Sequence, residues 1–341
     1  MRLAQKSILY KVLSNIKEND LVSPGEKIIV AVSGGADSVC LFEVLDKLKD
    51  ELKITLSVCH YDHRMRGKDS HDDFLFVKKM ATGRGVEFIG GEAKKANLFK
   101  SEEDARNARY SFFEKILKEG RGDKVAIAHN KNDLAETFFL RLFRGSGMRG
   151  LRSIPSWREK FTRPLLLISR KEIEQYLKNE NLPFRTDNTN FTTDYTRNFI
   201  RLKIMPQILQ INPNLIETIS SNIAVLDEDY DLLDKLTHEA YKKVLIKETG
   251  RKITLSRKKW LSLHSSLGAG VIRLAISKIS SLEDITYKQI YDVIKMIQKG
   301  EGKKFKPLPH SLRLCLLSGN IVILRLPNHT DLPTGRQVTN L

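Results

Sequence analysis

Cysteine is scarce in this chain, with Cys40, Cys59 and Cys315 the only three among 341 residues. No two of them form a CxxC pair, which argues against a zinc or iron–sulfur site built on cysteines. The eight histidines are scattered and show no HExxH or comparable ligand spacing. Each cysteine stands alone in an apolar segment, and this pattern predicts small buried side chains in a reducing compartment.

Long apolar segments are also missing. No run of about eighteen apolar residues occurs, so the sequence offers no candidate for a transmembrane helix. Residues 1–20 form an amphipathic pattern without the apolar core or the small-residue cleavage site of a signal peptide. We therefore expect no contact with a membrane and a cytoplasmic location.

Basic residues outnumber acidic ones, with 58 Lys and Arg against 41 Asp and Glu, a formal net charge of +17 and a pI near 9.6. Such an excess favours a polyanionic partner such as nucleic acid, although the same charge can serve solubility alone. At 41% hydrophobic content, a chain of 341 residues can form two or three folded domains. The sequence leaves the oligomeric state open, a homodimer included.

The segment from Lys27 to Ser38, KIIVAVSGGADS, reads as a buried strand, a glycine turn and the start of a helix. Its apolar, β-branched part is typical of a parallel strand that is covered on both faces. Ser33 is the predicted N-cap, and Gly34 and Gly35 allow a close approach of the backbone to a ligand. Unpaired N–H groups and the positive end of the helix dipole would then bind an anion. The alternative is a strand-to-helix connection without a ligand.

Strands and helices continue to alternate over the first half of the chain. Further strands are expected at 54–60, 86–89 and 124–129, and helices at 70–81, 101–117 and 131–143. This order predicts an α/β fold with a doubly wound, mainly parallel sheet of the Rossmann-like kind. Because ligands in such sheets lie at the carboxyl ends of strands, residues 33–38, 60–66 and 129–136 should converge on one crevice.

The second half is predicted to be more helical. Residues 151–206 suggest helices and loops with a polar insert at 186–190, and a long helix lies between 213 and 246. A strand at 252–256, helices at 269–279 and 285–297 and a hairpin of 311–317 with 321–326 indicate a small α+β domain. The expected domains are a catalytic domain at 1–211, a helical linker at 212–248, the α+β domain at 249–327 and a tail at 328–341.

The loop SGGADS lacks the lysine of a GxxxxGK[ST] loop and instead resembles the PP-loop of the ATP-pyrophosphatase superfamily. Segments that follow it resemble the tRNA(Ile)-lysidine synthetase family within that superfamily. They are His60–Arg66 (HxDHxLR with Met for Leu), Ala105–Tyr110 (ARxxRY), Arg144–Gly147 (RGSG), Arg163–Leu166 (RPLL) and Arg197–Arg201 (RNxxR). These ordered matches cover roughly residues 25 to 206.

The resemblance implies an enzyme that adenylates O2 of the wobble cytidine of a CAU-anticodon isoleucine tRNA with ATP and then adds free L-lysine at C2. By resemblance, Asp37, Asp133 and Glu136 are catalytic, and Asp37 lies near Mg²⁺. ATP would be bound by Ser33, Gly34, Gly35, Ala36, Asp37, Ser38, His60, Arg144 and Gly145. Lysine or tRNA would be bound by Arg106, Arg109, Asp133, Glu136, Arg197 and Arg201.

One segment departs from the family pattern AHHxDDxxET, because Asn130 replaces a histidine and Asn132 an aspartate. Metal ligation or base contacts by these two positions are therefore in question. Asp133 and Glu136 remain, and two anions suit the lysine ammonium. Either carboxylate could also take a proton from the amine, since an ammonium with a pKa near 10.4 is not nucleophilic.

Each motif also has a structural interpretation. Asp62 could orient a neighbouring imidazole or simply brace its loop, and Arg106 and Arg109 could bind phosphate or form surface salt bridges. The turn at Arg144 could close on phosphates or only cap a helix. The stripe that contains Asp133 could be a solvated helix face. Arg197 and Arg201, four residues apart, could have a purely structural role.

Two rival functions stay open at this point. A tRNA thiolase of the same superfamily would need a reactive cysteine, whereas Cys40 and Cys59 fall inside a predicted helix and strand. A non-catalytic basic tRNA-binding protein would not need the intact loop. By analogy with the family, the C-terminal domain should recognise tRNA, and Arg257–Lys259 beside Trp260 gives this expectation local support.

Overall fold

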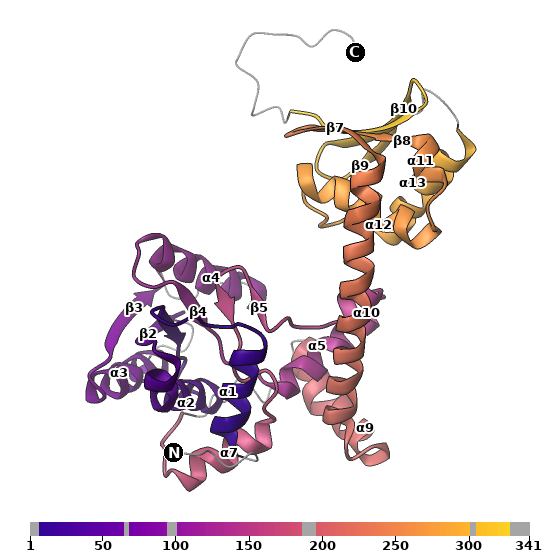
Figure 1. Cartoon of the computed structure of the whole chain (residues 1–341). Coiled ribbons are helices and arrows are strands. Elements are labelled where there is room, and N and C mark those ends of the chain that lie inside the picture. Colours follow the sequence, from indigo (N-terminus) through magenta and orange to yellow (C-terminus); the bar gives the residue numbers. More distant parts are fainter. Residues whose placement is uncertain (1–6, 65–67, 94–100, 186–195, 301–304, 328–341) are drawn as a thin grey trace. The chain divides into compact units, whose positions relative to one another are not determined.

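The computed structural model describes residues 7–64, 68–93, 101–185, 196–300 and 305–327 (Figure 1). The chain divides into two compact units, Met1–Leu226 and Asp227–Leu341. The polar insert expected at 186–190 and the tail expected at 328–341 lie outside the described residues. No helix of the described residues combines the length and the apolar character that a membrane crossing requires.

The first unit contains a six-stranded sheet with the order β3-β2-β1-β4-β6-β5. Every neighbouring pair is parallel except β5 with β6, so the predicted mainly parallel α/β fold is confirmed. The strands are β1 (Lys27–Ala31), β2 (Thr55–Asp62), β3 (Glu87–Glu92), β4 (Lys124–Ala126), β5 (Trp157–Arg158) and β6 (Phe161–Thr162). Strands β5 and β6 were not predicted, because a strand of two residues is too short to show an alternation of apolar and polar side chains.

Helices cover both faces of this sheet. The helices of this part of the chain are α1 (Ile8–Glu18), α2 (Ala36–Leu52), α3 (Lys68–Gly83), α4 (Glu102–Lys118), α5 (Lys131–Phe143), α6 (Met148–Leu151) and α7 (Arg170–Asn179). Alternate residues of β1 face opposite sides: Ile28 and Val30 pack with α1, α2 and α7, whereas Ile29 packs with α4. Burial on both faces explains the continuous apolar run of this strand.

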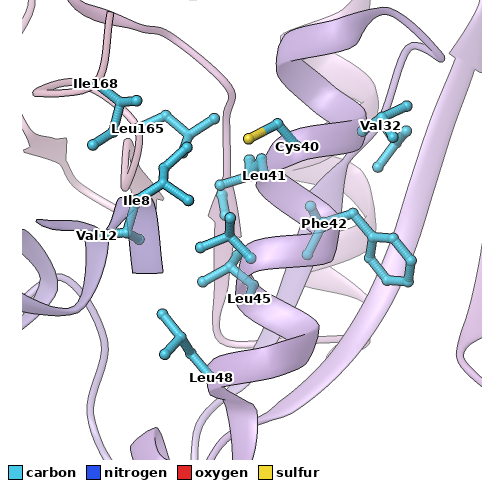
Figure 2. Packing of buried hydrophobic residues seen from close by; sticks show 14 of the residues in the cluster. Ile8, Val12, Val32, Cys40, Leu41, Phe42, Leu45, Leu48, Leu165 and Ile168 are labelled. Carbon is cyan, nitrogen blue, oxygen red and sulfur yellow. The ribbon is translucent and has the colours of Figure 1, made fainter. Parts of the chain in front are cut away.

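The core on the side of α2 fixes this helix against its neighbours. Figure 2 shows Leu41 and Leu45 of α2 among Ile8 and Val12 of α1, with Leu165 close by. Leu41 and Leu45 are fully buried. At about 25 cal/mol per Å² of buried apolar area, such side chains each stabilise the fold by roughly 1.5–3 kcal/mol. This packing holds the start of α2, and with it the glycine turn, in one place.

Element boundaries differ from prediction mainly at the ends. The helix at Lys131–Phe143 and the strand at Lys252–Ser256 have the predicted bounds. The strand expected at 124–129 ends at Ala126, since the N–H of His129 turns back to the carbonyl of Ile127 at 3.0 Å. Residues 196–211 form α8 (Thr196–Phe199), a π-helix at Ile200–Ile204 and α9 (Met205–Ile211).

The long predicted helix is α10 (Leu215–Val244). In the second unit a five-stranded antiparallel sheet has the order β7-β8-β11-β10-β9. Its strands are β7 (Leu245–Thr249), β8 (Lys252–Ser256), β9 (Lys306–Leu308), β10 (Leu312–Leu317) and β11 (Asn320–Arg325), and its helices are α11 (Arg257–Leu261), α12 (Ser265–Ile279) and α13 (Tyr287–Lys299). The predicted hairpin is present, and its turn residues Ser318 and Gly319 both have positive φ, as a two-residue type I′ turn requires.

The local support for tRNA recognition by this unit is weaker than the sequence suggested. Trp260 is buried in the core of the second unit and donates its indole N–H to the carbonyl of Gly268 at 3.1 Å. Arg257 donates to the carbonyls of Ile297 and Gln298 at 2.6 and 2.9 Å, near the end of α13. Both side chains therefore have structural contacts, and of this run only Lys258 and Lys259 are exposed.

Candidate active site

The glycine turn lies between β1 and α2 and is braced by its own serines. The Ser38 hydroxyl donates to the carbonyl of Gly35 at 2.9 Å and accepts the N–H of Ser33 at 3.1 Å. Gly34 has φ +94°, a conformation that favours glycine. The N-cap of α2 is Gly35, without a side-chain cap, so the prediction of Ser33 was wrong. The backbone at the start of a 17-residue helix is thus left for an anion.

Asp37 lies in the first turn of α2 and has two different oxygens. Its Oδ2 accepts a hydrogen bond from Arg170 Nη1 at 2.6 Å. Its Oδ1 is buried and has no hydrogen-bond partner among the described residues. Burial raises the pKa of Asp37 to about 6; the neighbouring carboxylate of Asp133 adds to this rise, and Arg170 opposes it. Asp37 and Asp133 therefore share one electrostatic environment.

These groups fit a magnesium ion that arrives with a nucleotide. Mg²⁺ prefers oxygen ligands and is commonly held by one or two carboxylates together with phosphates and water. The unpartnered Oδ1 of Asp37 is such an oxygen, and Asp37 follows the glycine turn directly. Within the described part of the chain, no group of three or more His, Cys, Asp or Glu side chains could hold a metal. The remaining ligands would therefore come from the triphosphate and water.

Asp133 and Glu136 lie in the first turns of α5 and are joined by two arginines. Glu136 accepts from Arg197 Nε at 3.0 Å and from Arg201 Nε and Nη2 at 2.6 and 2.9 Å. Asp133 Oδ1 accepts from Arg197 Nη2 at 3.0 Å. The Glu136 side chain is 4% exposed, so the pairing compensates a buried charge. The structure thus brings these four predicted residues together in one cluster of balanced charge.

The arginines come from an unusual segment. Arg197 lies on α8 and Arg201 on the π-helix at Ile200–Ile204. A π-turn changes the direction in which successive side chains point, and π-helical turns are frequent at functional sites. Here both guanidinium groups, four residues apart, reach the same carboxylate.

The two departures from the family pattern have structural roles. Asn130 is the N-cap of α5, and its side chain accepts from the N–H groups of Asn132 and Asp133 at 2.9 and 3.1 Å. Asp133 returns the contact by accepting the N–H of Asn130 at 2.9 Å, which completes a capping box. Asn132 accepts the N–H of Arg170, at the start of α7, at 3.0 Å. A neutral amide is sufficient for both contacts, because asparagine is among the favoured N-caps.

His129, which is partly exposed, pairs with buried Arg163. Residues 129–136 were expected at the crevice and Arg163 lies in one of the family motifs, but no role in the site was predicted for either residue. Arg163 Nε donates to His129 Nδ1 at 3.1 Å, and Arg163 Nη1 donates to the carbonyl of Pro155 at 2.9 Å. The pKa of His129 lies well below its ordinary value, because the ring is buried and because Arg163, Arg197 and two arginines of α4 lie near it. His129 is therefore a neutral imidazole.

His60 lies at the carboxyl end of β2, next to the glycine turn. Its Nδ1 donates to the carbonyl of Val32 at 2.8 Å, and the residue is buried. The carboxylate of Asp62 accepts the N–H of Arg64 at 2.7 Å, a contact that braces the loop. Residues 65–67 of this motif lie outside the described part of the chain.

Arg106 and Arg109 lie on one face of α4. The Arg106 guanidinium lies 5.0 Å from the centre of the Tyr110 ring, and both arginines are close enough to His129 to lower its pKa. This face of α4 therefore points toward the carboxyl end of β4. That position fits a role in binding an anionic substrate, which stays a prediction.

The turn at Arg144 and Gly145 ends α5 with a Schellman motif. The N–H of Gly145 donates to the carbonyl of Leu142 and that of Ser146 to the carbonyl of Arg141, both at 3.0 Å, and Gly145 has φ +73°. These hydrogen bonds join the turn to its own helix and not to the glycine turn at 33–38. Contacts of Arg144 and Gly145 with ATP therefore stay a prediction.

Two contacts of the site were not predicted from the sequence, for the same reason. Arg170 contacts Asp37 across 133 positions of sequence, and Arg163 contacts His129 across 34. A single sequence gives no signal for such pairs. Ser169 and Glu172 form a capping box that marks where α7 begins, and this signal could have placed Arg170 at a helix start.

Comparison with known proteins agrees with this geometry. A family model described as a PP-loop domain matches residues 5–208. The tRNA(Ile)-lysidine synthase of Caldanaerobacter subterraneus subsp. tengcongensis is 35% identical over 332 residues, which cover 95% of this chain and 70% of that protein. That of Clostridioides difficile is 34% identical and covers 93% of this chain, again over 70% of the relative. The chain thus spans about 70% of the length of these relatives.

Among solved structures, the U34-tRNA thiolase NcsA from Methanococcus maripaludis with its [4Fe-4S] cluster is similar in fold. Its TM-score is 0.55 over 64% of this chain and 78% of that one. At 18% sequence identity the likeness concerns the fold alone.

Proposed function

Because the chain belongs to the tRNA(Ile)-lysidine synthase family, we propose that it is an ATP-dependent ligase that joins free L-lysine to C2 of the wobble cytidine of CAU-anticodon isoleucine tRNA. One observation carries this proposal beyond the family match. Asp37, beside the phosphate-binding turn, lies close enough to Asp133 for the two carboxylates to influence each other. A site for ATP and a site for a cationic amino acid are therefore adjacent.

In the first step, O2 of the cytidine attacks the α-phosphorus of ATP and pyrophosphate leaves. The backbone at the start of α2 and the hydroxyls of Ser33 and Ser38 would hold phosphate oxygens. Asp37 would hold Mg²⁺ through Oδ1, and the ion would neutralise charge on the departing pyrophosphate. Arg170 keeps the other oxygen of Asp37 occupied and so fixes the direction in which Oδ1 points.

The α-ammonium and α-carboxylate of free lysine suit the four-residue cluster, because this pair of groups and the cluster both carry balanced charge. The α-ammonium of an amino acid can bind Asp133 and Glu136, while its α-carboxylate can bind the guanidinium groups of Arg197 and Arg201. Bound in this way, lysine would extend its ε-amine away from the cluster toward C2. This assignment uses all four side chains, and it explains why the acids are accompanied by arginines.

The same contacts bear on which group removes a proton from the amine. Glu136 already accepts three hydrogen bonds from two arginines. Asp133 accepts from Arg197 through one oxygen and from the N–H of Asn130 through the other. Both carboxylates are thus already engaged, and in this binding mode they contact the α-ammonium and not the ε-amine. We therefore assign Asp133 and Glu136 to binding lysine, and proton removal from the ε-amine to neither of them.

The experiment uses purified protein, an unmodified tRNA transcript with a CAU anticodon, ATP, Mg²⁺ and radiolabelled lysine. Label should enter the tRNA, and AMP and pyrophosphate should form in equal amounts. Asp37→Ala should lower the rate at least 100-fold, because it removes the magnesium ligand. The matched control is Asp50→Asn, an exposed carboxylate on the same helix, which should retain full activity. Label that stays out of the tRNA in the wild-type reaction would refute the proposal.

Sulfur transfer by this fold is disfavoured by the state of the cysteines. Cys40 and Cys59 are buried, and burial raises the pKa of both thiols, so neither is a reactive thiolate. Cys315 lies in the other unit and is also buried. The double variant Cys40→Ala and Cys59→Ser should still incorporate lysine into tRNA, whereas a thiolase that depends on these cysteines would lose its activity.

A further inference from the structure

His129 is fixed in one tautomer. Its Nδ1 accepts a hydrogen bond from Arg163 Nε at 3.1 Å, and a guanidinium can only donate. The ring proton must therefore be on Nε2. Arg163 is itself 5% exposed and anchored on the carbonyl of Pro155. The ring can neither turn over nor exchange tautomers without breaking this contact.

The ring also stays uncharged. The ring is shielded from solvent and feels the charges of Arg163, Arg197, Arg106 and Arg109, so a fifth positive charge beside these four guanidinium groups is unfavourable. Near neutral pH His129 is therefore a permanent hydrogen-bond donor through Nε2 and does not act as an acid or a base.

The position of His129 places this donor between the two candidate substrate sites. It immediately precedes Asn130, the N-cap of α5, whose side-chain amide lies beside Asp37 and influences its pKa. Asp133 and Glu136 follow on the first turns of the same helix. The residue is partly exposed, and over the described part of the chain the contact with Arg163 is the one hydrogen bond of its side chain. Nε2–H is thus the polar atom that His129 offers to a substrate.

We propose that His129 is a specificity-determining residue whose Nε2–H donates a hydrogen bond to N3 of the target cytidine, an inference that rests on the proposed function. N3 of cytosine is an acceptor, whereas N3 of uracil carries a hydrogen. Because Nε2–H of His129 cannot become an acceptor, it can form a hydrogen bond with N3 of cytosine. With uracil, Nε2–H and the N3–H group would face each other as two donors without an acceptor. Buried, unpaired donors are costly, which makes the discrimination strong.

The contact is compatible with both chemical steps. O2 of the cytidine must stay free to attack phosphorus, and a donor at N3 leaves it free. After O2 has been adenylated, the in-plane lone pair of N3 is still an acceptor. The same hydrogen bond can therefore hold the base in the enzyme from the first step to the second, and reading of the Watson–Crick edge is a common mode for a base held in a pocket.

The test removes each partner of the proposed hydrogen bond in turn: N3 of the cytidine and the side chain of His129. The substrates are the CAU tRNA with cytidine or with 3-deazacytidine, in which C–H replaces N3, at the wobble position. With wild-type enzyme, the Kd of the 3-deazacytidine tRNA should be about tenfold higher, since His129 loses its acceptor. Binding is compared because replacing N3 also lowers the reactivity of C2 toward an amine. With His129→Leu both tRNAs should bind weakly and within twofold of each other. The control His238→Leu, an exposed histidine of α10, should keep the wild-type ratio.

Two outcomes would overturn the proposal: equal Kd for the two tRNAs with wild-type enzyme, or an undiminished difference in Kd with His129→Leu. If His129→Leu does not fold, His129→Gln gives the second measurement. Its amide can turn to present an acceptor, so the affinity ratio of cytidine to uridine tRNA, measured by competition, should fall at least threefold; an unchanged ratio would contradict the proposal. Wild-type enzyme that modifies neither substrate would refute the proposed function instead.

Discussion

At the scale of single residues, the candidate site contains charged groups whose burial lowers the stability of the folded protein. Asp37 shows this most clearly. Its carboxylate is mostly buried, one oxygen lacks a hydrogen-bond partner and a second carboxylate lies nearby, so its ionised form is favoured by Arg170 and by the side-chain amide of Asn130 alone among the described residues. Functional sites commonly carry such strain, and other contacts of the fold compensate it.

This strain predicts how stability should change with pH. The pKa of Asp37 is raised from 3.8 to about 6 in the folded protein, so the folded state binds this proton more tightly than the unfolded state does. Ionisation of Asp37 therefore lowers stability progressively between about pH 4 and pH 6, and the full cost is present above pH 6. Asp37→Asn should raise the unfolding free energy by about 3 kcal/mol at pH 7.5 and by about half as much at pH 5.

Thermal or denaturant unfolding of the nucleotide-free protein at the two pH values measures this effect. The control Asp50→Asn lies on the same helix but is exposed, and should change stability little at either pH. A stabilisation by Asp37→Asn that is the same at pH 5 and pH 7.5 would show that the pKa of Asp37 is not raised.

Residues at the start of a helix could be interpreted from the sequence more easily than the residues with which they form ion pairs. The sequence places Asn130, Asp133 and Glu136 at the start of a helix with the correct bounds, Lys131–Phe143. It gives no indication that Asp133 and Glu136 are neutralised by Arg197 and Arg201, because those arginines are more than sixty positions away. Local capping is encoded within four residues, whereas ion pairs across the fold depend on packing that a single sequence does not display.

At the scale of elements, period and length decided what could be predicted. The strand 27–31 and helix α2 were clear, because an apolar run changes to helical spacing at a glycine pair. Strands β5 and β6 have two residues each, and no pattern distinguishes them from a loop. The π-helix at Ile200–Ile204 has the composition of an α-helix, so its extra residue per turn could not be foreseen.

The contacts of Arg201, which lies on the π-helix, predict that Arg201 and Glu136 are strongly coupled in their effects on stability. Arg201 contacts both oxygens of a side chain that is 4% exposed, so Arg201→Met leaves a buried charge with one partner fewer. It should destabilise the protein by about 3 kcal/mol alone, and by about 1 kcal/mol in a Glu136→Gln background. The double-mutant cycle by denaturant unfolding measures the difference.

An exposed pair supplies the comparison for that cycle. Lys17 and Glu51 form an ion pair at 2.9 Å with side chains that are 57% and 47% exposed. Lys17→Met should cost less than about 0.5 kcal/mol, since solvent screens such pairs. Equal costs for Arg201→Met with and without Glu136 would mean that the cluster is not coupled.

At the scale of the whole molecule, the core of the first unit is completed by the start of α10. Leu215, Ile219 and Ile223 are buried against α5 and α9, and Glu217 holds Lys131 of α5 at 2.8 and 2.9 Å. Residues further along the same helix, including Tyr241 and Val244, belong to the core of the second unit. The division at Leu226 thus separates two sets of apolar contacts within a single helix.

This division predicts where the chain can be cut. A fragment of residues 1–226 should unfold cooperatively and bind ATP as tightly as the full chain, but bind tRNA at least tenfold more weakly, because the second unit contributes basic surface. A fragment of residues 1–249 should aggregate, since it exposes Tyr241 and Val244 and leaves β7 without β8. Calorimetry, ATP titration and tRNA binding on both fragments test this. Equal tRNA affinity of fragment 1–226 and full chain would exclude the second unit from recognition.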